Sequence, residues 1–485
     1  MSDWESVIGL EVHVQLKTRS KIFSGAPTAF GAPPNAQACA VDLALPGVLP
    51  VLNAEAVRMA IVFGLAVEGE IAERCRFDRK SYFYPDLPKG YQISQLDEPI
   101  VGGGHLDIET EDGAAKRIHL TRAHLEEDAG KSLHEDYQGK TGIDLNRAGT
   151  PLLEVVSEPE LASPEEAGRY FRTLHTLVRT LGICDGNLNE GSMRCDANVS
   201  VRPRGSTALG ERTEIKNLNS FRFLDKALAF EIERQIDRLE SGGTVERQTL
   251  LYDAERNETR PMRGKELSDD YRYFPDPDLL PVVVTESMLA QARATIPELP
   301  AAKRRRYVEE LGLTDYDARW LAVDPDTATY FEAAAIASGQ PKATANWVMG
   351  DVAAAVRRED TAWTEVPVPA AQLGKLIERI EDGSISGKIA KSLFKTLWDD
   401  GGEVDELIDS QGLKQVSDSD EIAAIVRQVI DSNPAQVEQV RSGKTRVLGF
   451  LVGQAMKASG GKANPKRVSE LLREALSTNV SPTCR

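Results

Sequence analysis

The sequence has few cysteines and no long hydrophobic run. Its five cysteines are odd in number and widely spaced in 485 residues, so we expect no disulfide framework and a reducing compartment, the cytoplasm. The first residues show no signal peptide. The apolar run from Met59 to Val67 is too short to span a bilayer and predicts a buried helix, so we expect no membrane attachment.

Positive charge is also scarce. The net charge of -17 argues against indiscriminate nucleic-acid binding. The C-terminal end differs, because residues 435–485 contain nine Lys or Arg against three acids, and this local excess predicts a polyanionic partner. The bases are Arg441, Lys444, Arg446, Lys457, Lys462, Lys466, Arg467, Arg473 and Arg485.

A phosphate-binding P-loop is absent as well. Ala129 to Ser132 imitates the end of one, but Leu125 occupies the position of the required glycine. If the protein uses ATP, it holds the nucleotide in another way.

The length suggests two to four domains. Residues up to about Ala290 have the pattern of strands and loops, and most of the remainder has the pattern of short helices, which predicts an α+β fold. The change falls near residues 296–300, where two prolines separate the segments, and a second break is expected near residues 400–402.

The stretch from Val7 to Leu16 alternates apolar and polar residues as a strand does. Glu11 and His13 share its polar face and supply half of a divalent-metal site if other elements add oxygens. The alternative is a plain polar sheet edge.

Two later stretches repeat this alternation. Arg194 and Asp196 lie on the polar face of residues 192–202, and Glu214 and Lys216 share a face of residues 212–217. If one antiparallel sheet joins the three strands, their acids converge.

Between these strands the chain carries three consecutive acids, Glu126, Glu127 and Asp128, which repel one another unless a cation binds or the turn is solvated. An oxygen-rich cluster with one imidazole suits Mg²⁺ better than zinc, and Arg194 or Lys216 could neutralise phosphate oxygens. Phosphoryl transfer needs such an arrangement.

Residues 78–95 place four aromatic residues, Tyr82, Phe83, Tyr84 and Tyr91, among basic residues and two prolines. Such a loop can stack on a ligand, including an unpaired nucleotide. The alternative is an aromatic corner that covers one end of a sheet.

Several long strings of the chain together resemble one known family. They are VIGLEVHVQL, YFYPDLPKGYQISQ, HLEEDAGKS, DLNRAGTPLLEVVSEPE, GSMRCDANVSVRP, EIKNLNSFR, DDYRYFPDPDL, IPELP and GFLVGQAMKASGGKANP. The resemblance is to the B subunits of aspartyl/glutamyl-tRNA amidotransferases and runs from Trp4 to about Leu476.

This resemblance implies a glutamine-synthetase-like antiparallel-sheet cradle domain over residues 1–292, an all-α helical domain over 293–405 and a basic, tRNA-binding helical tail over 406–485. The subunit would use ATP and Mg²⁺ to phosphorylate the side-chain carboxylate of misacylated Glu-tRNA(Gln) or Asp-tRNA(Asn). Ammonia released from glutamine by the A subunit would then complete the amidation, and a C subunit would clamp A and B together. The sequence does not choose between the two tRNAs.

The resemblance also assigns roles to residues. Glu11, His13, Glu126 and Asp196 would hold metal, with Glu127 and Glu214 as companions, and Lys80 and Lys89 would line the ammonia route or the phosphate site. Arg194 and Lys216 remain the candidates for nucleotide phosphate.

Members of the family that bind zinc carry four cysteines in the region where this chain has Ser24, Ala26, Cys39 and Asp42. Three of four thiolates are missing, so we predict no zinc.

Two other functions stay open at this point. One is a tRNA-binding scaffold subunit that has lost its own chemistry and has no use for the converged acids. The other is a Mg²⁺-dependent phosphohydrolase, which would cleave ATP or phosphate esters without charged tRNA.

Overall fold

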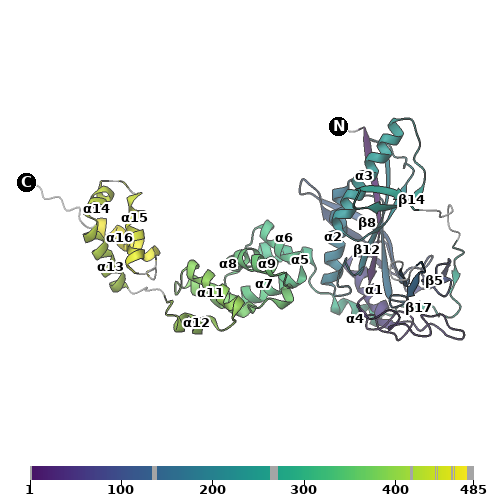
Figure 1. Cartoon of the computed structure of the whole chain (residues 1–485), viewed down its shortest axis with the longest axis horizontal. Helices are drawn as coiled ribbons and strands as arrows, with labels where there is room; N and C mark the ends of the chain where they lie inside the picture. Colours follow the sequence, from purple (N-terminus) through teal and green to yellow (C-terminus); the bar gives the residue numbers. More distant parts are fainter. Residues whose placement is uncertain are drawn as a thin grey trace, which may run out of the picture. The chain divides into compact units, whose positions relative to one another are not determined.

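The computed structural model describes residues 3–133, 139–262, 271–414, 419–442, 444, 446–459, 463 and 465–477. The chain forms two compact units, residues 1–300 and residues 301–485 (Figure 1). Each is described separately.

The first unit is built on a ten-stranded sheet in the order β15-β14-β13-β12-β1-β11-β8-β6-β2, with β7 also paired to β8. Its strands are β1 (Trp4–Gln15), β2 (Glu70–Ile71), β6 (Val101–Gly102), β7 (His105–Glu109), β8 (Ala115–Glu127), β11 (Pro151–Ser157), β12 (Met193–Pro203), β13 (Thr213–Leu218), β14 (Gln248–Asp253) and β15 (Glu258–Pro261). The N-terminal strand therefore lies in the middle of the sheet.

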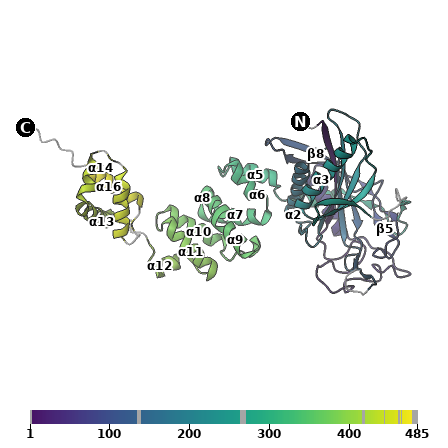
Figure 2. The same ribbon diagram turned by 45° about the horizontal axis from the view of Figure 1, so that its top comes forward.

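Alternation along β1 decides which face of the sheet is covered. Ile8, Leu10 and Val12 are at most 1% exposed and share one core with side chains of helices α2 (Pro164–Thr180) and α3 (Phe221–Glu240). Figure 2 shows these two helices beside the sheet. Because they cover the apolar face, the opposite face carries the polar residues of every central strand.

One strand pair differs from the expected antiparallel arrangement. β13 and β14 run parallel, with Ile215 opposite Leu250, whereas the other pairs of the sheet are antiparallel. The reason is the connection: α3 crosses over between the two strands, and such a crossover returns the chain in the same direction.

A three-stranded sheet of β4 (Asp78–Ser81), β5 (Tyr91–Ser94) and β16 (Phe274–Pro275) forms a separate layer. The aromatic segment is thus largely a hairpin rather than one loop. The remaining short strands and helices of the unit are β3 (Arg74–Cys75), β9 (Lys131–Leu133), β10 (Gly142–Asp144), β17 (Val282–Val283), α1 (Ala54–Ala66) and α4 (Glu286–Thr295). The predicted buried helix over residues 59–67 is confirmed as part of α1, in which Phe63 is fully buried.

The second unit is helical and contains two hydrophobic cores with no common member. Its helices are α5 (Pro300–Glu309), α6 (Asp315–Ala322), α7 (Pro325–Ser338), α8 (Pro341–Trp347), the π-helix η1 (Val348–Val352), α9 (Ala353–Glu359), the 3-10 helix η2 (Trp363–Glu365), α10 (Ala370–Glu381), α11 (Gly387–Asp399), α12 (Val404–Ser410), α13 (Ser419–Ser432), α14 (Pro434–Arg441), α15 (Val447–Ala458) and α16 (Pro465–Ser477). One core includes Tyr307 and Phe331, and the other includes Leu451 and Leu472.

These observations confirm the predicted α+β class, with a sheet region followed by helices. Cys39, Cys75, Cys184 and Cys195 are free thiols, as expected. Within the described residues no helix is both long and apolar enough to cross a membrane. Of the basic C-terminal set, Lys462 and Arg485 lie outside the described residues.

Candidate functional site

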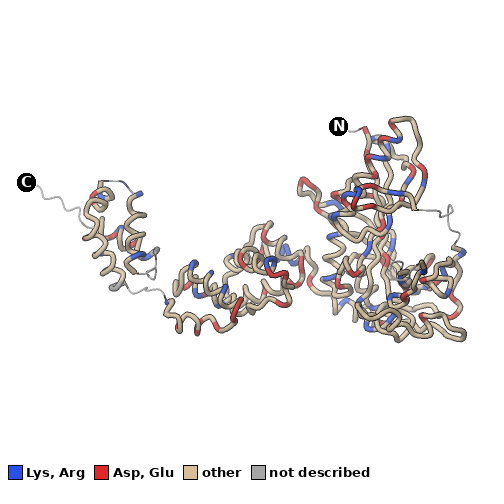
Figure 3. The backbone as a smooth tube through the Cα atoms, in the orientation of Figure 1, with Lys and Arg blue, Asp and Glu red and all other residues tan. Residues whose placement is uncertain are grey.

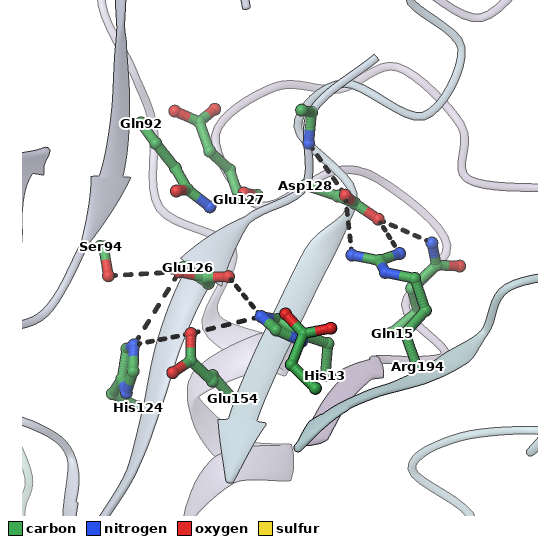
Figure 4. Close-up of polar contacts among 12 residues, drawn as sticks. His13, Gln15, Gln92, Ser94, His124, Glu126, Glu127, Asp128, Glu154 and Arg194 are labelled. Carbon is green, nitrogen blue, oxygen red and sulfur yellow. Dashed lines mark hydrogen bonds and ion pairs between the residues drawn. The ribbon is translucent and has the colours of Figure 1, made fainter. Parts of the chain in front are cut away.

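The polar face of the sheet gathers a histidine and two glutamates from three adjacent strands. His13 of β1 lies opposite Glu154 of β11, and Glu126 comes from the end of β8. His13 Nε2 is 3.4 Å from Glu154 Oε2 and 3.8 Å from Glu126 Oε1 (Figure 4). One ligand atom of each residue lies within 4.8 Å of the others, which is the spacing of groups that share a metal ion.

A second imidazole closes this cluster. His124 Nε2 is 3.5 Å from Glu154 Oε2 and 3.8 Å from Glu126 Oε2. Its Nδ1 accepts a hydrogen bond of 3.3 Å from Arg122 Nε, which orients the ring. Glu154 thus lies between two imidazoles, and Glu126 also accepts a bond of 3.4 Å from the hydroxyl of Ser94.

The pKa values in the cluster are set by its burial and by the charges of its acids and imidazoles. Burial alone would lower the pKa of His13, but its hydrogen bond and charge interaction with Glu154, together with the charge of Glu126, raise that pKa to about 9. Burial opposes ionisation of Glu154, yet the charges of His124 and His13 lower its pKa well below the usual range. At neutral pH the protonated imidazole therefore partly balances the acids, and a bound cation would displace that proton.

The cluster fits a divalent cation by its donor set. Two carboxylates supply oxygens, the imidazoles supply nitrogens, and His13 Nδ1 is buried with no hydrogen-bond partner among the described residues. Carboxylate oxygens suit Mg²⁺ and Mn²⁺, whereas imidazole nitrogens suit transition metals such as iron and zinc.

The other predicted metal ligands form a neighbouring group around Lys216. Its ammonium is 2.9 Å from Glu214 and 3.5 Å from Asp196. Glu11 lies opposite Asp196 in the sheet and accepts a 3.0 Å bond from Asn198 Nδ2. Burial and then the charges of Glu154, Glu214 and Asp196 raise the pKa of Glu11, so the two groups share one electrostatic field. Glu11, Asp196 and Glu214 are therefore beside the histidine cluster rather than in it.

Two placements differ from the sequence prediction. The acidic stretch is not a solvated turn: Glu126 and Glu127 end strand β8 and both are buried. Because successive residues of a strand point to opposite faces, Glu127 turns away from Glu126 and pairs with Lys89, while its carboxylate accepts a 2.9 Å bond from the backbone N–H of Ile93.

The arginine predicted to meet phosphate is already paired. Arg194 donates two hydrogen bonds, of 2.9 and 3.1 Å, to Asp128, and Gln15 donates a third of 2.9 Å to the same acid. Burial opposes the charge of Asp128, but Arg194 and Arg147 lower its pKa. Lys216 is also paired, with Glu214 and Asp196, but its side chain is 40% exposed against 18% for Arg194, so it is the more accessible of the two cations to a ligand.

Lys80 faces the cluster from the neighbouring hairpin. Its ammonium lies 4.8 Å from the ring centroid of Tyr271 and 5.8 Å from that of Tyr82. Burial would lower the pKa of Lys80, but the charges of Glu126, Tyr273 and Glu154 raise it. A cation thus lies within the field of the acids that would hold a metal.

The segment that lacks the four-cysteine pattern, residues 24–42, is connected to Lys21 by a buried ion pair with Asp42. Lys21 is fully buried, and its ammonium is 3.3 Å from Asp42 Oδ2 and donates a 3.1 Å bond to the carbonyl of Leu145. Asp42 also accepts from the hydroxyl of Ser24 at 3.1 Å and from the backbone N–H of Cys39 at 2.8 Å. The absence of zinc remains a prediction.

Neither Glu154 nor His124 is among the metal ligands that the sequence predicts, although His124 lies next to the acidic stretch. The sequence contains a feature that could have indicated each residue. Glu154 is the only charged residue of the strand PLLEVVS, and His124 precedes a buried leucine in an alternating strand. Only the register, which places Glu154 opposite both His13 and His124, shows that they belong to the site.

The fold and the site together define a two-unit protein whose first unit carries a candidate metal centre on the polar face of its sheet. Residues 6–290 match the family model described as the GatB/GatE catalytic domain, and residues 329–476 match the one described as the GatB domain. The chain belongs to the family of aspartyl/glutamyl-tRNA(Asn/Gln) amidotransferase B subunits.

Curated relatives agree along nearly the whole chain. The protein of that name from Nitrosococcus oceani is 60% identical over 98% of this chain and 100% of its own length. Those from Halorhodospira halophila and Pseudomonas fluorescens are 61% and 59% identical, each over 98% of this chain and 99% of their own lengths.

Proposed function

We propose that this chain is the carboxylate-activating subunit of a tRNA-dependent amidotransferase. It would use ATP to phosphorylate the side-chain carboxylate of Glu-tRNA(Gln) or Asp-tRNA(Asn), and ammonia would then convert the acyl phosphate to the amide. The single observation that carries this proposal is the cluster of His13, Glu126 and Glu154 within the part of the chain that matches the catalytic domain. A scaffold has no need of such a cluster.

The reaction balances in two steps. A carboxylate oxygen of the aminoacyl group attacks the γ-phosphorus of ATP and ADP leaves, which forms an acyl phosphate. Ammonia then attacks the acyl carbon, loses a proton and expels phosphate. Both steps develop or move negative charge, so they depend on positioned cations and on exclusion of water.

The residues of the chain have separate tasks in this proposal. His13, Glu126 and Glu154 would hold Mg²⁺, whose chemistry is to neutralise phosphate oxygens. Lys80, whose charge is maintained by the neighbouring acids, would orient the anionic substrate, and Lys216 would meet phosphate at the edge of the site. Lys89, held by Glu127, would line the ammonia route or the phosphate site.

Partners and domains follow from the same proposal. A glutaminase A subunit would supply ammonia, and a C subunit would join A and B. The helical region over residues 293–405 would link the catalytic domain to a tail over 406–485 that contacts the body of the tRNA. Support for the last role is the basic excess of the C-terminal part of this tail, residues 435–485, which contain nine Lys or Arg against three acids. Figure 3 draws Lys and Arg in blue and Asp and Glu in red along the described residues.

The test is ATP consumption by the reconstituted complex, with and without Glu-tRNA(Gln). We expect Glu126→Gln and His13→Ala each to abolish most tRNA-dependent ADP formation, because each removes a charge-balancing ligand. Glu160→Gln makes the same chemical change as the first variant at an exposed carboxylate and should retain activity. Full activity in both site variants contradicts the assignment, and ADP formation without charged tRNA would indicate a phosphohydrolase.

A further inference from the structure

The turn of the β4–β5 hairpin, residues 82–90, displays an aromatic side chain to solvent. Phe83 is 93% exposed, the largest exposed fraction among the large hydrophobic residues described. Tyr84 beside it is 40% exposed. An exposed ring loses the free energy that burial would give it, so a protein gains from such a residue chiefly when a ligand covers it.

This turn is held in place rather than free to collapse. Within it, the N–H of Leu87 donates to the carbonyl of Tyr84 at 3.0 Å and that of Gly90 to Leu87 at 2.9 Å. The N–H of Gly130 donates to the carbonyl of Asp86 at 2.8 Å, and Lys89 pairs with Glu127. Two prolines restrict the backbone further. The backbone of the turn that carries Phe83 is therefore held in place.

A line of aromatic contacts connects the turn with the metal-binding cluster. Tyr84 and Tyr82 meet edge to face with centroids 6.0 Å apart, and Tyr82 lies 5.8 Å from the ammonium of Lys80. Lys80 precedes Phe83 by three residues, and three residues span at most about 11 Å. The backbone that carries Phe83 therefore belongs to the same hairpin as Lys80, whose charge lies in the field of Glu126 and Glu154.

We propose that Phe83 is a stacking platform for the unpaired terminal base of the aminoacylated RNA. Single-stranded RNA ends are bound by stacking on aromatic side chains, which tolerates any base. The adenine of ATP is a weaker candidate, because small ligands are enclosed in pockets and this ring is almost entirely exposed. The inference rests on the proposed function and adds the residue that would position the aminoacyl end.

The test uses the reconstituted complex and a hairpin RNA with an unpaired 3′ end whose last base is 2-aminopurine, without ATP. Stacking quenches the fluorescence of this base, so we expect quenching with the native chain and with Phe83→Tyr, and its loss with Phe83→Ala. Affinity for the RNA should be about 5- to 150-fold lower in Phe83→Ala than in the native chain. For RNA trimmed of its unpaired end, the two chains should have the same affinity. The matched control is Phe30→Ala, an exposed phenylalanine of a different segment, which should behave as the native chain.

Three results would overturn the inference. The first is unchanged quenching in Phe83→Ala. The second is that Phe83→Ala weakens the binding of a fluorescent ATP analogue instead of RNA. The third is that Phe83→Ala prevents assembly of the complex instead of lowering RNA affinity, which would mean that a partner protein covers the ring. Because the quenching needs no ATP, it is independent of the ADP assay with Glu126→Gln. Failure of the stacking and failure of the proposed chemistry are therefore distinguishable.

Discussion

Glu154 lies between the imidazoles of His13 and His124, and we expect it to matter as much as Glu126. Glu154→Gln keeps the shape of the side chain but removes the charge that holds both rings. The affinity for Mn²⁺ or Mg²⁺, measured by titration calorimetry, should fall at least about 10-fold, the size of effect that loss of even an outer-shell partner gives. An affinity equal to that of Glu160→Gln would contradict this assignment.

Single residues show why the site could be predicted only in part. The alternation of apolar and polar residues around His13 correctly predicts that His13 lies on the polar face of its strand. This is possible because the side chains of a strand alternate between its two faces, which is a local property of the sequence. Glu154 and His124 are separated from His13 by more than a hundred residues, and their meeting depends on strand register, which one sequence does not specify. The sequence predicts Glu127 as a member of the cluster, because consecutive acids cannot be assigned to opposite faces until the strand that contains them is known.

Lys21 and Asp42 provide a prediction on stability. Burial lowers the pKa of Lys21 against the opposing charge of Asp42, so each partner depends on the other. Lys21→Met leaves a buried carboxylate and should cost about 3–5 kcal/mol of unfolding free energy.

The double variant Lys21→Met with Asp42→Leu serves as the control for this pair. It removes both charges, so it should be more stable than Lys21→Met alone. Denaturant unfolding of the native chain, of each single variant and of the double variant measures this difference. If the double variant only adds the two losses, the pair is not coupled.

Among the elements, helix α3 sets the relative direction of one strand pair of the sheet. Its crossover makes β13 and β14 parallel, and Glu231 at its centre is bound by Thr213 of β13 at 2.9 Å and Thr259 of β15 at 2.8 Å. The strands themselves could be predicted from alternation. Their relative direction could not, because it is set by how the helix returns the chain.

The charge of Glu231 makes this contact dependent on pH. Burial raises its pKa, but hydrogen bonds from Arg234 and Gln235 outweigh it and the pKa is lowered overall. A carboxyl with a lowered folded-state pKa stabilises the fold above its unfolded value near 4.3, and this contribution is lost as pH falls through the folded pKa.

We therefore expect Glu231→Gln to destabilise the first unit by about 1.5–3 kcal/mol at pH 7. The difference from the native chain should shrink below about pH 4, because protonation removes the same charge from the native side chain. Urea unfolding followed at both pH values measures this, and a difference independent of pH would argue against the charged network.

At the scale of the whole molecule, the uneven distribution of charge predicts how RNA is bound. Lys457→Glu with Arg473→Glu reverses two charges of the basic C-terminal helices. Binding of tRNA should weaken similarly for all tRNA sequences. The slope of log affinity against log salt should become shallower by about 0.9 for each phosphate that the tail no longer neutralises.

Lys388→Glu with Lys395→Glu, on α11, supplies a control of equal charge change outside the tail. Equal weakening of RNA binding by both pairs would mean that the effect is general and that the tail has no special role.

Composition and pattern predict the order of the large parts, a sheet region and then helices, because each hydrophobic period is repeated over a long part of the chain. The domain limits at residues 292 and 405 remain predictions. The apolar pattern alone does not reveal where one core ends, since the cores formed around Tyr307 and around Leu451 are both built mainly of Ala, Val, Leu and Ile.

The central place of β1 has a consequence for synthesis of the protein in the cell. Its partners β11 and β12 are completed only at residues 157 and 203, so the ribosome must add nearly two hundred residues before both edges of β1 are paired. At roughly 5–20 residues per second this takes roughly 10–40 s. During that time a strand with one apolar face keeps at least one edge open to other nascent chains. Early protection by a chaperone would therefore benefit this protein more than one whose first strand lies at a sheet edge.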